Sequence, residues 1–254
     1  MNKLEKLHKA NTDKALPDRS VSMSNALSRG AQGLNLSQKR VIALAMASTD
    51  SIASKMLIEG QVSGWKVRLT AADYAATFEV DSDTAYNQIK DSSRSLLKCL
   101  WRTVEPTKKG EVITEGPWAI LAQYRKGEGC VDLTFSPHIA PHLLALRKHF
   151  TTYQLKQAAA LRSIYAWRLF ECLKSWESTG VWSPTIEEFQ KAMNAPPSAR
   201  ENFKELRRAI LEPAIKELRE KDNLLIECEQ KTRGRKVVGL VLRFTPDPQG
   251  SLPL

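Results

Sequence analysis

The sequence is poor in cysteine, and no two of its four cysteines form a CxxC pattern. Disulfide frameworks and cysteine-based zinc sites both need cysteines at short, regular spacings. We therefore expect reduced thiols that act as packing residues in a cytoplasmic protein; they are Cys99, Cys130, Cys172 and Cys228.

Long apolar runs are also missing. No stretch approaches the roughly 18 apolar residues that a membrane-spanning helix needs. The first twenty residues, MNKLEKLHKANTDKALPDRS, are polar and contain no apolar segment of the kind that directs secretion. The sequence thus predicts no membrane-spanning helix and no membrane partner. It also predicts a flexible basic tail over residues 1–20.

Motifs that carry catalysis are absent too. There is no P-loop, no GxGxxG after an expected strand, no GxSxG and no zinc-spaced set of cysteines and histidines. His138 and His142 are four residues apart, but Pro141 interrupts a regular helix and no HExxH pattern is present. We interpret both histidines as structural. We expect no catalytic residue, no cofactor and no metal ion, and hence a protein that is not an enzyme.

What the sequence has in excess is positive charge. Lys and Arg number 38 against 28 Asp and Glu, which gives a net charge of +10 at pH 7. Such an excess favours an acidic partner: nucleic acid, an anionic membrane surface or an acidic protein. It is equally compatible with a solvated surface, so the positions of the cations must decide.

Apolar spacing in the first half predicts helices over 23–48, 71–78 and 84–100. Asn35 or Ser37 is the expected N-cap of the first helix, and Thr70 that of the second. A strand is expected over 65–69. Further short strands are expected over 111–126 and 130–135, joined by the turn KGEG.

The second half repeats this plan. It contains an amphipathic helix over 153–176, then a short helix with Thr185 as N-cap and Glu188 as its capping-box partner. A turn, NAPPSA, precedes a long helix over 199–221 that Pro213 interrupts. The runs LLIECEQ and VVGLVLRF, joined by KTRGRK, form a candidate β-hairpin.

The two halves match in spacing as well as in kind. Each has the order short helix, turn, longer helix, β-hairpin, which is a helix-turn-helix with a wing. The sequence therefore predicts an α+β protein with two tandem winged-helix domains, over 21–150 and 151–254. The positions that coincide are Thr70, Asp73, Tyr74 and Phe78 with Thr185, Glu188, Phe189 and Met193.

Basic residues concentrate in the second half at two places. A recognition helix reads base edges with residues near its N-terminal end, and arginine fits guanine with two hydrogen bonds. We therefore expect base contacts from Arg207 and Arg208, with Arg200 and Lys204 beside them. The wing tip is expected to hold phosphates through Lys231, Arg233, Arg235 and Lys236. The alternative for the helix is a solvated face on which Glu201 and Glu205 neutralise the cations.

The first half is less basic at the matching positions. Lys90 occupies the position of Arg207 and Arg94 lies one turn further, but Asp91 occupies the position of Arg208. Lys108 and Lys109 are expected in the loop before the strands. We interpret this domain as a weaker DNA contact, made more through phosphates than through bases, or in part as plain surface charge.

Several runs in the chain carry a family resemblance. FTTYQLKQAAALRSIYAWRLFECLKSW, TIEEFQKAM, FKELRRAILEPAIKELRE and GRKVVGLVLRF resemble the C-terminal half of plasmid replication initiators of the RepE/RepA/π type. MSNALSRGAQGLNLSQKRVIALAMA and LTAADYAATFEVDSDTAYNQIKDSSRSLLK are similar to the first half of the same family. The resemblance covers nearly everything after the tail and is most specific over 161–173 and 206–218. It implies two winged-helix domains that bind origin direct repeats (iterons) as a monomer.

The resemblance also implies partners and a division of labour. In such families a dimer, in equilibrium with the monomer, can bind an operator inverted repeat at the initiator's own promoter and repress it. The N-terminal domain carries the dimer and backbone contacts, and the C-terminal domain reads most bases through the helix matched by 200–211. Host partners are the chromosomal initiator ATPase, the replicative helicase, and chaperones that convert dimer to monomer.

Two functions of other classes remain open on the residues alone. One is a winged-helix transcription repressor that uses the same tandem fold but never opens an origin. The other is a basic protein that binds RNA or a membrane surface, for which no preference for a repeated duplex site is expected.

Overall fold

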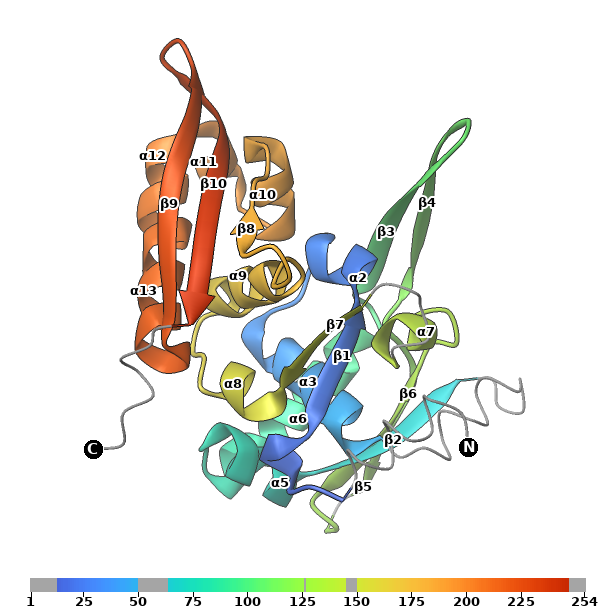
Figure 1. Cartoon of the computed structure of the whole chain (residues 1–254). Helices are drawn as coiled ribbons and strands as arrows, with labels where there is room; N and C mark the ends of the chain where they lie inside the picture. The colour runs from blue at the N-terminus through green and yellow to red at the C-terminus, as the bar shows by residue number, and fades with distance from the viewer. Residues whose placement is uncertain (1–12, 50–63, 126, 145–149, 247–254) are drawn as a thin grey trace. The chain divides into compact units, whose positions relative to one another are not determined.

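The computed structural model describes residues 13–49, 64–125, 127–144 and 150–246 (Figure 1). The chain divides into two compact units. Unit 1 holds the chain through Leu27 together with Gly33–Ala159, and unit 2 holds Ser28–Gln32 together with the chain from Ala160 onward. The chain therefore passes between the units three times, and a short N-terminal segment belongs to the C-terminal unit.

The boundary between the units falls after Ala159 and not after residue 150 as the sequence suggested. The reason is a strand pairing between distant segments: β7 (Phe150–Gln154) runs antiparallel to β1 (Ser20–Ser24). The last residue of the expected tail, Ser20, is thus part of a sheet, and a 3-10 turn (Leu16–Asp18) precedes it. The tail before residue 13 lies outside the described residues.

Unit 1 combines helices with one three-stranded sheet and two sheets of two strands. After β1 its elements are α2 (Asn25–Arg29), which runs across the unit boundary, then α3 (Leu36–Ser48), β2 (Trp65–Thr70), α5 (Ala71–Phe78), α6 (Ser82–Leu96), β3 (Leu100–Thr107), β4 (Gly110–Pro117), β5 (Ala119–Arg125), β6 (Cys130–Phe135), α7 (Ala140–Leu143), β7 and α8 (Leu155–Ala159).

Unit 2 contains one three-stranded sheet and a set of helices packed against it (Figure 1). Its elements are α9 (Ile164–Lys174), β8 (Val181–Trp182), α10 (Ile186–Ala192), α11 (Pro197–Glu201), α12 (Phe203–Leu206), a π turn (Arg207–Leu211), α13 (Glu212–Asp222), β9 (Leu224–Arg233) and β10 (Lys236–Pro246).

The two units share one sheet topology. The strand order is β2–β6–β5 in unit 1 and β8–β10–β9 in unit 2. In both, the strand that precedes the helix-turn-helix pairs with the last strand, which also pairs with the strand before it. Each unit also has a helix-turn-helix, formed by α5 and α6 in unit 1 and by α10 to α13 in unit 2. A helix-turn-helix combined with this sheet is a winged helix. The predicted α+β fold with two tandem winged-helix domains is confirmed.

The helix starts follow the N-cap residues of the sequence. The Asn35 side chain accepts the backbone N–H of Gln38 and completes a capping box at α3. Thr70 Oγ1 accepts the N–H of Asp73 at 3.0 Å, and Thr185 forms a capping box with Glu188 at α10. These side chains satisfy donors that have no partner inside the helix. All three N-cap predictions are confirmed.

Two long helices expected from periodicity are shorter in the structure. The pattern over 23–48 divides into β1, α2 and α3, and the pattern over 153–176 divides into β7, α8 and α9. In both cases apolar residues of a strand happen to fit the spacing of the helix that follows. These residues form strands because β1 and β7 pair with each other. α9 starts at Ile164, because Ser163 caps it by accepting the N–H groups of Tyr165 and Ala166, and Glu217 accepts the backbone N–H groups of Arg162 and Ser163 ahead of it.

A buried ion pair holds the N-terminal segment of unit 2. Arg168 and Glu171 on α9 are almost fully buried, and their charged atoms lie 3.0 Å apart. The remaining guanidinium N–H groups of Arg168 donate to the carbonyls of Ser28, Gly30 and Ala192. Arg168 therefore links the segment Ser28–Gln32 to the helix-turn-helix of the unit to which it belongs.

The structure also shows the state of the cysteines and the apolar character of the helices. All four cysteines are free thiols, two of them buried and two half-buried. In the part of the chain that the structure describes, no helix combines the length and the apolar character needed to cross a membrane.

Candidate nucleic-acid interface

The segment expected to be one helix from Ala199 is divided in unit 2. Asn202 has an extended backbone (φ −131°, ψ 109°), and its side chain caps α12 by accepting the N–H of Lys204. Arg200 therefore lies on the separate helix α11 and not at the front of the longer one. Its Nε donates to the Ala195 carbonyl at 2.6 Å, so one of its donors is already used by the turn between α10 and α11.

From Phe203 onward the chain is helical through Asp222, but a π turn interrupts the regular spacing. The N–H of Glu212 donates to the carbonyl of Arg207, five residues earlier. Pro213 follows directly. A proline has no N–H to donate and its ring collides with the carbonyl four residues before it, so the wider turn relieves the crowding. The proline was expected to kink the helix or to start a new segment, and it lies in the first turn of a separate segment, α13, which follows the π turn.

The inner and outer faces of this helix are sharply divided. The buried face consists of Leu206, Ile210, Leu211, Ala214 and Leu218. Lys204, Arg207 and Arg208 are exposed, as expected for residues that contact a partner.

Arg207 and Arg208 each have a carboxylate partner on the same helical stretch. Arg207 Nε lies 2.7 Å from Glu212 Oε1, and an Arg208 guanidinium nitrogen lies 2.8 Å from Glu205 Oε2. The hydrogen bond from Arg208 lowers the pKa of the Glu205 carboxyl and raises the pKa of Arg208. The alternative of a solvated face, on which Glu201 and Glu205 neutralise the cations, is thus correct for Glu205. Glu201 forms no ion pair within the described residues. The partner of Arg207 is Glu212, which that alternative did not include.

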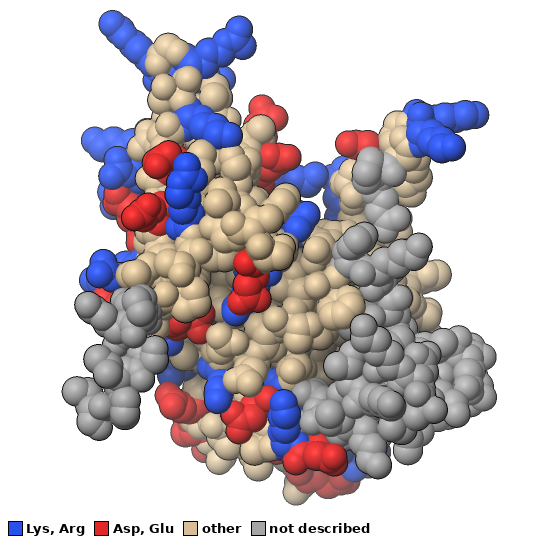
Figure 2. Space-filling view, in the orientation of Figure 1, with Lys and Arg blue, Asp and Glu red and all other residues tan. Residues whose placement is uncertain are grey.

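The wing of unit 2 is the hairpin of β9 and β10, which turns at Gly234 and Arg235. Gly234 has a φ of +62°, a conformation that glycine adopts at little cost. Figure 2 shows Lys and Arg side chains gathered at the tip of this hairpin. Its four predicted phosphate contacts are all exposed: Lys231, Arg233, Arg235 and Lys236.

The wing is attached, just below its tip, to the residues ahead of α10. Lys231 Nζ donates to Ser183 Oγ at 2.7 Å, and the N–H of Leu240 donates to the Pro184 carbonyl at 3.0 Å. A β-bulge interrupts the register between Val237 and Gly239. The wing and the helix-turn-helix are therefore positioned relative to each other by direct hydrogen bonds.

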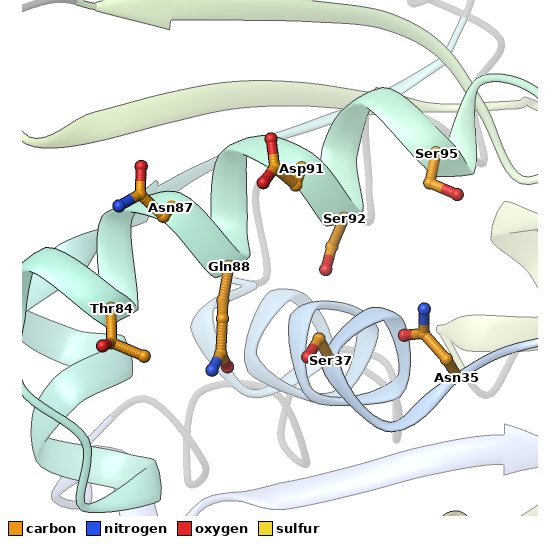
Figure 3. Close-up of a pocket in the computed structure, with 8 residues that line it drawn as sticks. All are labelled: Asn35, Ser37, Thr84, Asn87, Gln88, Asp91, Ser92 and Ser95. Atoms are coloured by element: carbon orange, nitrogen blue, oxygen red, sulfur yellow. The ribbon is translucent and has the colours of Figure 1, made fainter.

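The matching helix of unit 1, α6, has a mostly uncharged surface. Between α6 and the start of α3 lies a hollow of about 520 Å³ (Figure 3), and Asp91 is the one charged residue among those that line it. Gln88 and Ser92 point toward α3, whereas Asn87 and Asp91 point away from it. The other lining residues are Asn35, Ser37, Thr84 and Ser95.

The two cations predicted on α6 lie on its surface. Lys90 is half-buried and Arg94 is exposed, with its guanidinium carbon 5.8 Å from the centre of the Tyr124 ring. Asp91 is also exposed and carries the opposite charge. The placement of these residues is compatible with the weaker contact expected for this unit.

Lys108 and Lys109 lie at the tip of a hairpin that the sequence analysis missed. β3 and β4 pair along their whole length, from Leu100 opposite Pro117 to Thr107 opposite Gly110. The two lysines lie in the turn directly ahead of β4, as expected, but a strand that was not expected, β3, precedes them, and Figure 2 shows Lys and Arg side chains at this tip. The signal was present: Lys109-Gly110 lies between runs rich in Thr, Val and Ile, a hairpin pattern.

A second basic cluster was also missed. Asp132 on β6 is 1% exposed and accepts hydrogen bonds from Arg68 on β2, at 2.7 Å, and Arg125 on β5, at 3.0 Å. Lys66 Nζ lies 3.7 Å from the same carboxylate. The hydrogen bond from Arg68 is the main cause that lowers the pKa of Asp132 to about 2. The alternation in WKVRLT predicts that Lys66 and Arg68 share a face, but only strand order brings them to Asp132.

Of the two histidines, His142 lies as a structural residue does. His142 is buried on α7, with Nδ1 2.8 Å from Ser24 Oγ and its ring against Trp101, while His138 is exposed. Within the described residues, no group of three His, Cys, Asp or Glu is arranged to hold a metal ion.

Comparison with known proteins gives two family matches and several relatives. Residues 20–174 match the model "Initiator Replication protein, WH1", and residues 185–244 match "Initiator Rep protein, WH2". An uncharacterised 27.6 kDa protein of Escherichia coli is 29% identical over 233 residues, which cover 89% of this chain and 95% of the relative. A probable replication protein of Bifidobacterium longum (strain NCC 2705) is 29% identical over 114 residues, which cover 45% of this chain and 38% of the relative.

A solved structure shares the fold. The Pi initiator protein, determined in complex with iteron DNA, superposes with a TM-score of 0.72 at 21% identity. The match covers 91% of this chain and 99% of that one. At this identity the likeness establishes the arrangement of elements in a tandem winged-helix protein.

Proposed function

The chain belongs to the initiator replication protein family, whose members are DNA-binding plasmid replication initiators with two winged-helix domains, and we propose that it starts replication by binding origin direct repeats. In this proposal unit 2 is the main sequence-reading domain. Arg207 and Arg208 contact base edges in a major groove, with Lys204 beside them. Arg200, whose Nε is already used within the turn, contacts the DNA backbone from α11.

The observation that carries the proposal is the attachment of the wing to the helix-turn-helix. The hairpin has four exposed cations, Lys231, Arg233, Arg235 and Lys236. It is hydrogen-bonded to Ser183, through Lys231 itself, and to Pro184, just ahead of α10. Phosphate contacts position a protein on the duplex, and base contacts supply its specificity. A wing fixed in this way supports backbone contacts beside the groove that the helix enters.

Unit 1 is proposed to make the weaker contact. Lys90 and Arg94 on α6 and Lys108 and Lys109 at the β3–β4 tip are candidates for phosphate contacts. Asp91 points outward from α6 and would repel phosphates, which argues against close entry of this helix into a groove.

Further parts of the proposal rest on the family relationship. They are a homodimer in equilibrium with the monomer, formed through unit 1, and repression of the gene's own promoter by that dimer at an operator inverted repeat. They also include the host initiator ATPase, the replicative helicase and chaperones as partners, a cytoplasmic location, and the absence of an enzymatic activity.

Plasmid maintenance tests the proposal directly. The gene is supplied with its flanking DNA on a replicon that lacks any other origin, in a host of related plasmids. We expect maintenance, and we expect the flanking DNA to contain direct repeats at intervals of about two helical turns, which put successive sites on one face. A chain that binds the repeats without sustaining the replicon would be a repressor. Equal affinity for repeats and scrambled duplex would contradict sequence reading altogether.

A further inference from the structure

The two arginines at the front of this helix, Arg207 and Arg208, are both occupied by carboxylates. Arg207 pairs with Glu212 at 2.7 Å and Arg208 with Glu205 at 2.8 Å. The four wing cations differ, because no ion pair of theirs occurs within the described residues. The helix front therefore has three cations, including Lys204, against two carboxylates, while the wing tip over residues 231–236 has cations and no carboxylate.

The π turn is what brings Arg207 to its partner. In a regular α-helix, side chains three or four residues apart are neighbours, and residues five apart lie on different faces. The hydrogen bond from Glu212 N–H to the Arg207 carbonyl widens the turn so that residues five apart come close. Pro213 directly follows this turn and lacks the N–H of a regular helix, so the wider turn and the position of the Arg207 guanidinium occur together with the proline.

Both pairs are exposed enough to open. The exposed fractions of the side chains are 52% for Arg207 and 69% for Arg208. Ion pairs of this kind contribute little to stability and are broken readily when a better partner is present. Guanine offers arginine two acceptors in a fixed geometry, whereas a phosphate beside the groove brings its negative charge close to the carboxylate partner as well.

We propose that Glu205 and Glu212 are specificity-determining residues, which hold Arg208 and Arg207 back from arbitrary DNA and release them to the correct bases. This inference rests on the proposed function. On a wrong sequence the arginines stay paired, and the two carboxylates repel the phosphates on either side of the groove. On the correct sequence the bidentate contact with guanine replaces the carboxylate. The residues thus lower affinity for non-cognate DNA more than for the cognate repeat.

The test compares Glu205→Gln, Glu212→Gln and the double variant in the full-length protein. Affinity is measured by fluorescence anisotropy on a duplex with the flanking direct repeat and on a scrambled duplex of equal composition. We expect each substitution to raise affinity for the scrambled duplex by about threefold to tenfold and affinity for the repeat by less than about twofold. The salt slope on scrambled DNA should steepen by about 0.9 for each freed arginine that reaches a phosphate.

Glu220→Gln is the matched control. Glu220 is an exposed carboxylate on α13 that pairs with Lys216 at 3.9 Å, so its loss changes the net charge equally. If Glu220→Gln raises scrambled-duplex affinity as much as the test variants do, total charge explains the effect and the inference is overturned. Equal gains on both duplexes, or no gain on either, overturn it as well. A wild-type chain that does not prefer the repeat overturns the proposed function and the inference together.

A second measurement addresses the pairs themselves. The Nε–H resonance of Arg207 in the free protein should shift on Glu212→Gln and remain in place on Glu220→Gln. If it does not respond to loss of Glu212, Arg207 is not held by that carboxylate in solution, and the inference is overturned for this residue.

Discussion

Gly239 of β10 lies directly against Pro184, which precedes the N-cap of α10. A Cβ added to Gly239 would stand 2.9 Å from the Pro184 carbonyl oxygen, closer than such contacts normally come. The same carbonyl accepts the N–H of Leu240 at 3.0 Å. The absence of a side chain at this one position lets the wing meet the helix-turn-helix.

Gly239→Ala is therefore expected to displace the wing. The added methyl group forces the backbone of β10 away from Pro184, at a cost of about 1–3 kcal/mol of unfolding free energy. DNA affinity should fall as well, because the wing no longer lies beside the groove. Chemical denaturation and anisotropy measure the two effects. Val238→Ala, a change at the exposed neighbouring residue, is the control, and an equal loss in both variants would rule out the close approach as the cause.

Arg207→Ala is expected to reduce binding to the cognate repeat by about 1–3 kcal/mol and to relax the preference at one or two base pairs. The reason is that a bidentate arginine both adds affinity and rejects other bases. Binding to a panel of single-base variants of the repeat measures both effects. Lys216→Ala, an exposed cation further along α13, should leave the preference unchanged. Unchanged affinity and preference in Arg207→Ala would remove this residue from the base contacts.

Arg235→Ala is expected to weaken binding to all sequences alike. A phosphate contact carries no sequence information, and its loss lowers the slope of log affinity against log salt by about 0.9. Titrations on repeat and scrambled duplexes at several salt concentrations provide the slope. A slope as steep as that of the wild type would mean that the wing tip does not touch the backbone.

Local features of the fold could be predicted from the sequence. Asn35, Thr70 and Thr185 each cap the helix that follows, because the cap depends on residues within one turn. The β9–β10 hairpin was equally predictable from its turn and its apolar runs. The tandem match of the two halves added what single motifs lack, a repeated spacing of caps, helices and strands.

Features that depend on distant residues could not be predicted. The apolar spacing over 153–176 gives no sign that Phe150–Gln154 is a strand. That strand pairs with Ser20–Ser24, over a hundred residues earlier in the chain. The contacts of Asp132 require the order of three strands. The acidic partner of Arg207 was missed because i,i+5 neighbours arise only in a π turn, which Pro213 alone does not announce.

Removing one partner of the buried pair Arg168–Glu171 is expected to destabilise the protein strongly. Arg168→Met removes the arginine from the buried Glu171 carboxylate and takes the donor away from three backbone carbonyls, for a loss of about 3–5 kcal/mol. Urea denaturation measures this loss of unfolding free energy. Lys174→Met, which removes a pair with the exposed Glu177, should cost less than about 1 kcal/mol. Comparable losses in the two variants would contradict a special role for the buried pair.

Asp132 gives a pH dependence whose direction follows from its lowered pKa. The pKa is about 2 in the folded protein against 3.8 for an ordinary Asp, mainly because Arg68 donates to the carboxylate. The folded state therefore binds this proton less tightly than the unfolded state. The stabilisation, about 1–3 kcal/mol, is fully present above about pH 4 and is lost as the pH falls toward 2.

Asp132→Asn should remove that dependence. We expect it to be less stable than the wild type at pH 7 by about 1–3 kcal/mol, and the difference should shrink between pH 4 and pH 2 as the wild-type carboxylate takes up its proton. Denaturation midpoints across this range measure it. Glu115→Gln, which removes an exposed carboxylate 3.5 Å from Arg102, should change stability little at any pH. A constant difference between Asp132→Asn and wild type down to pH 2 would show that packing, and not charge, is what the aspartate contributes.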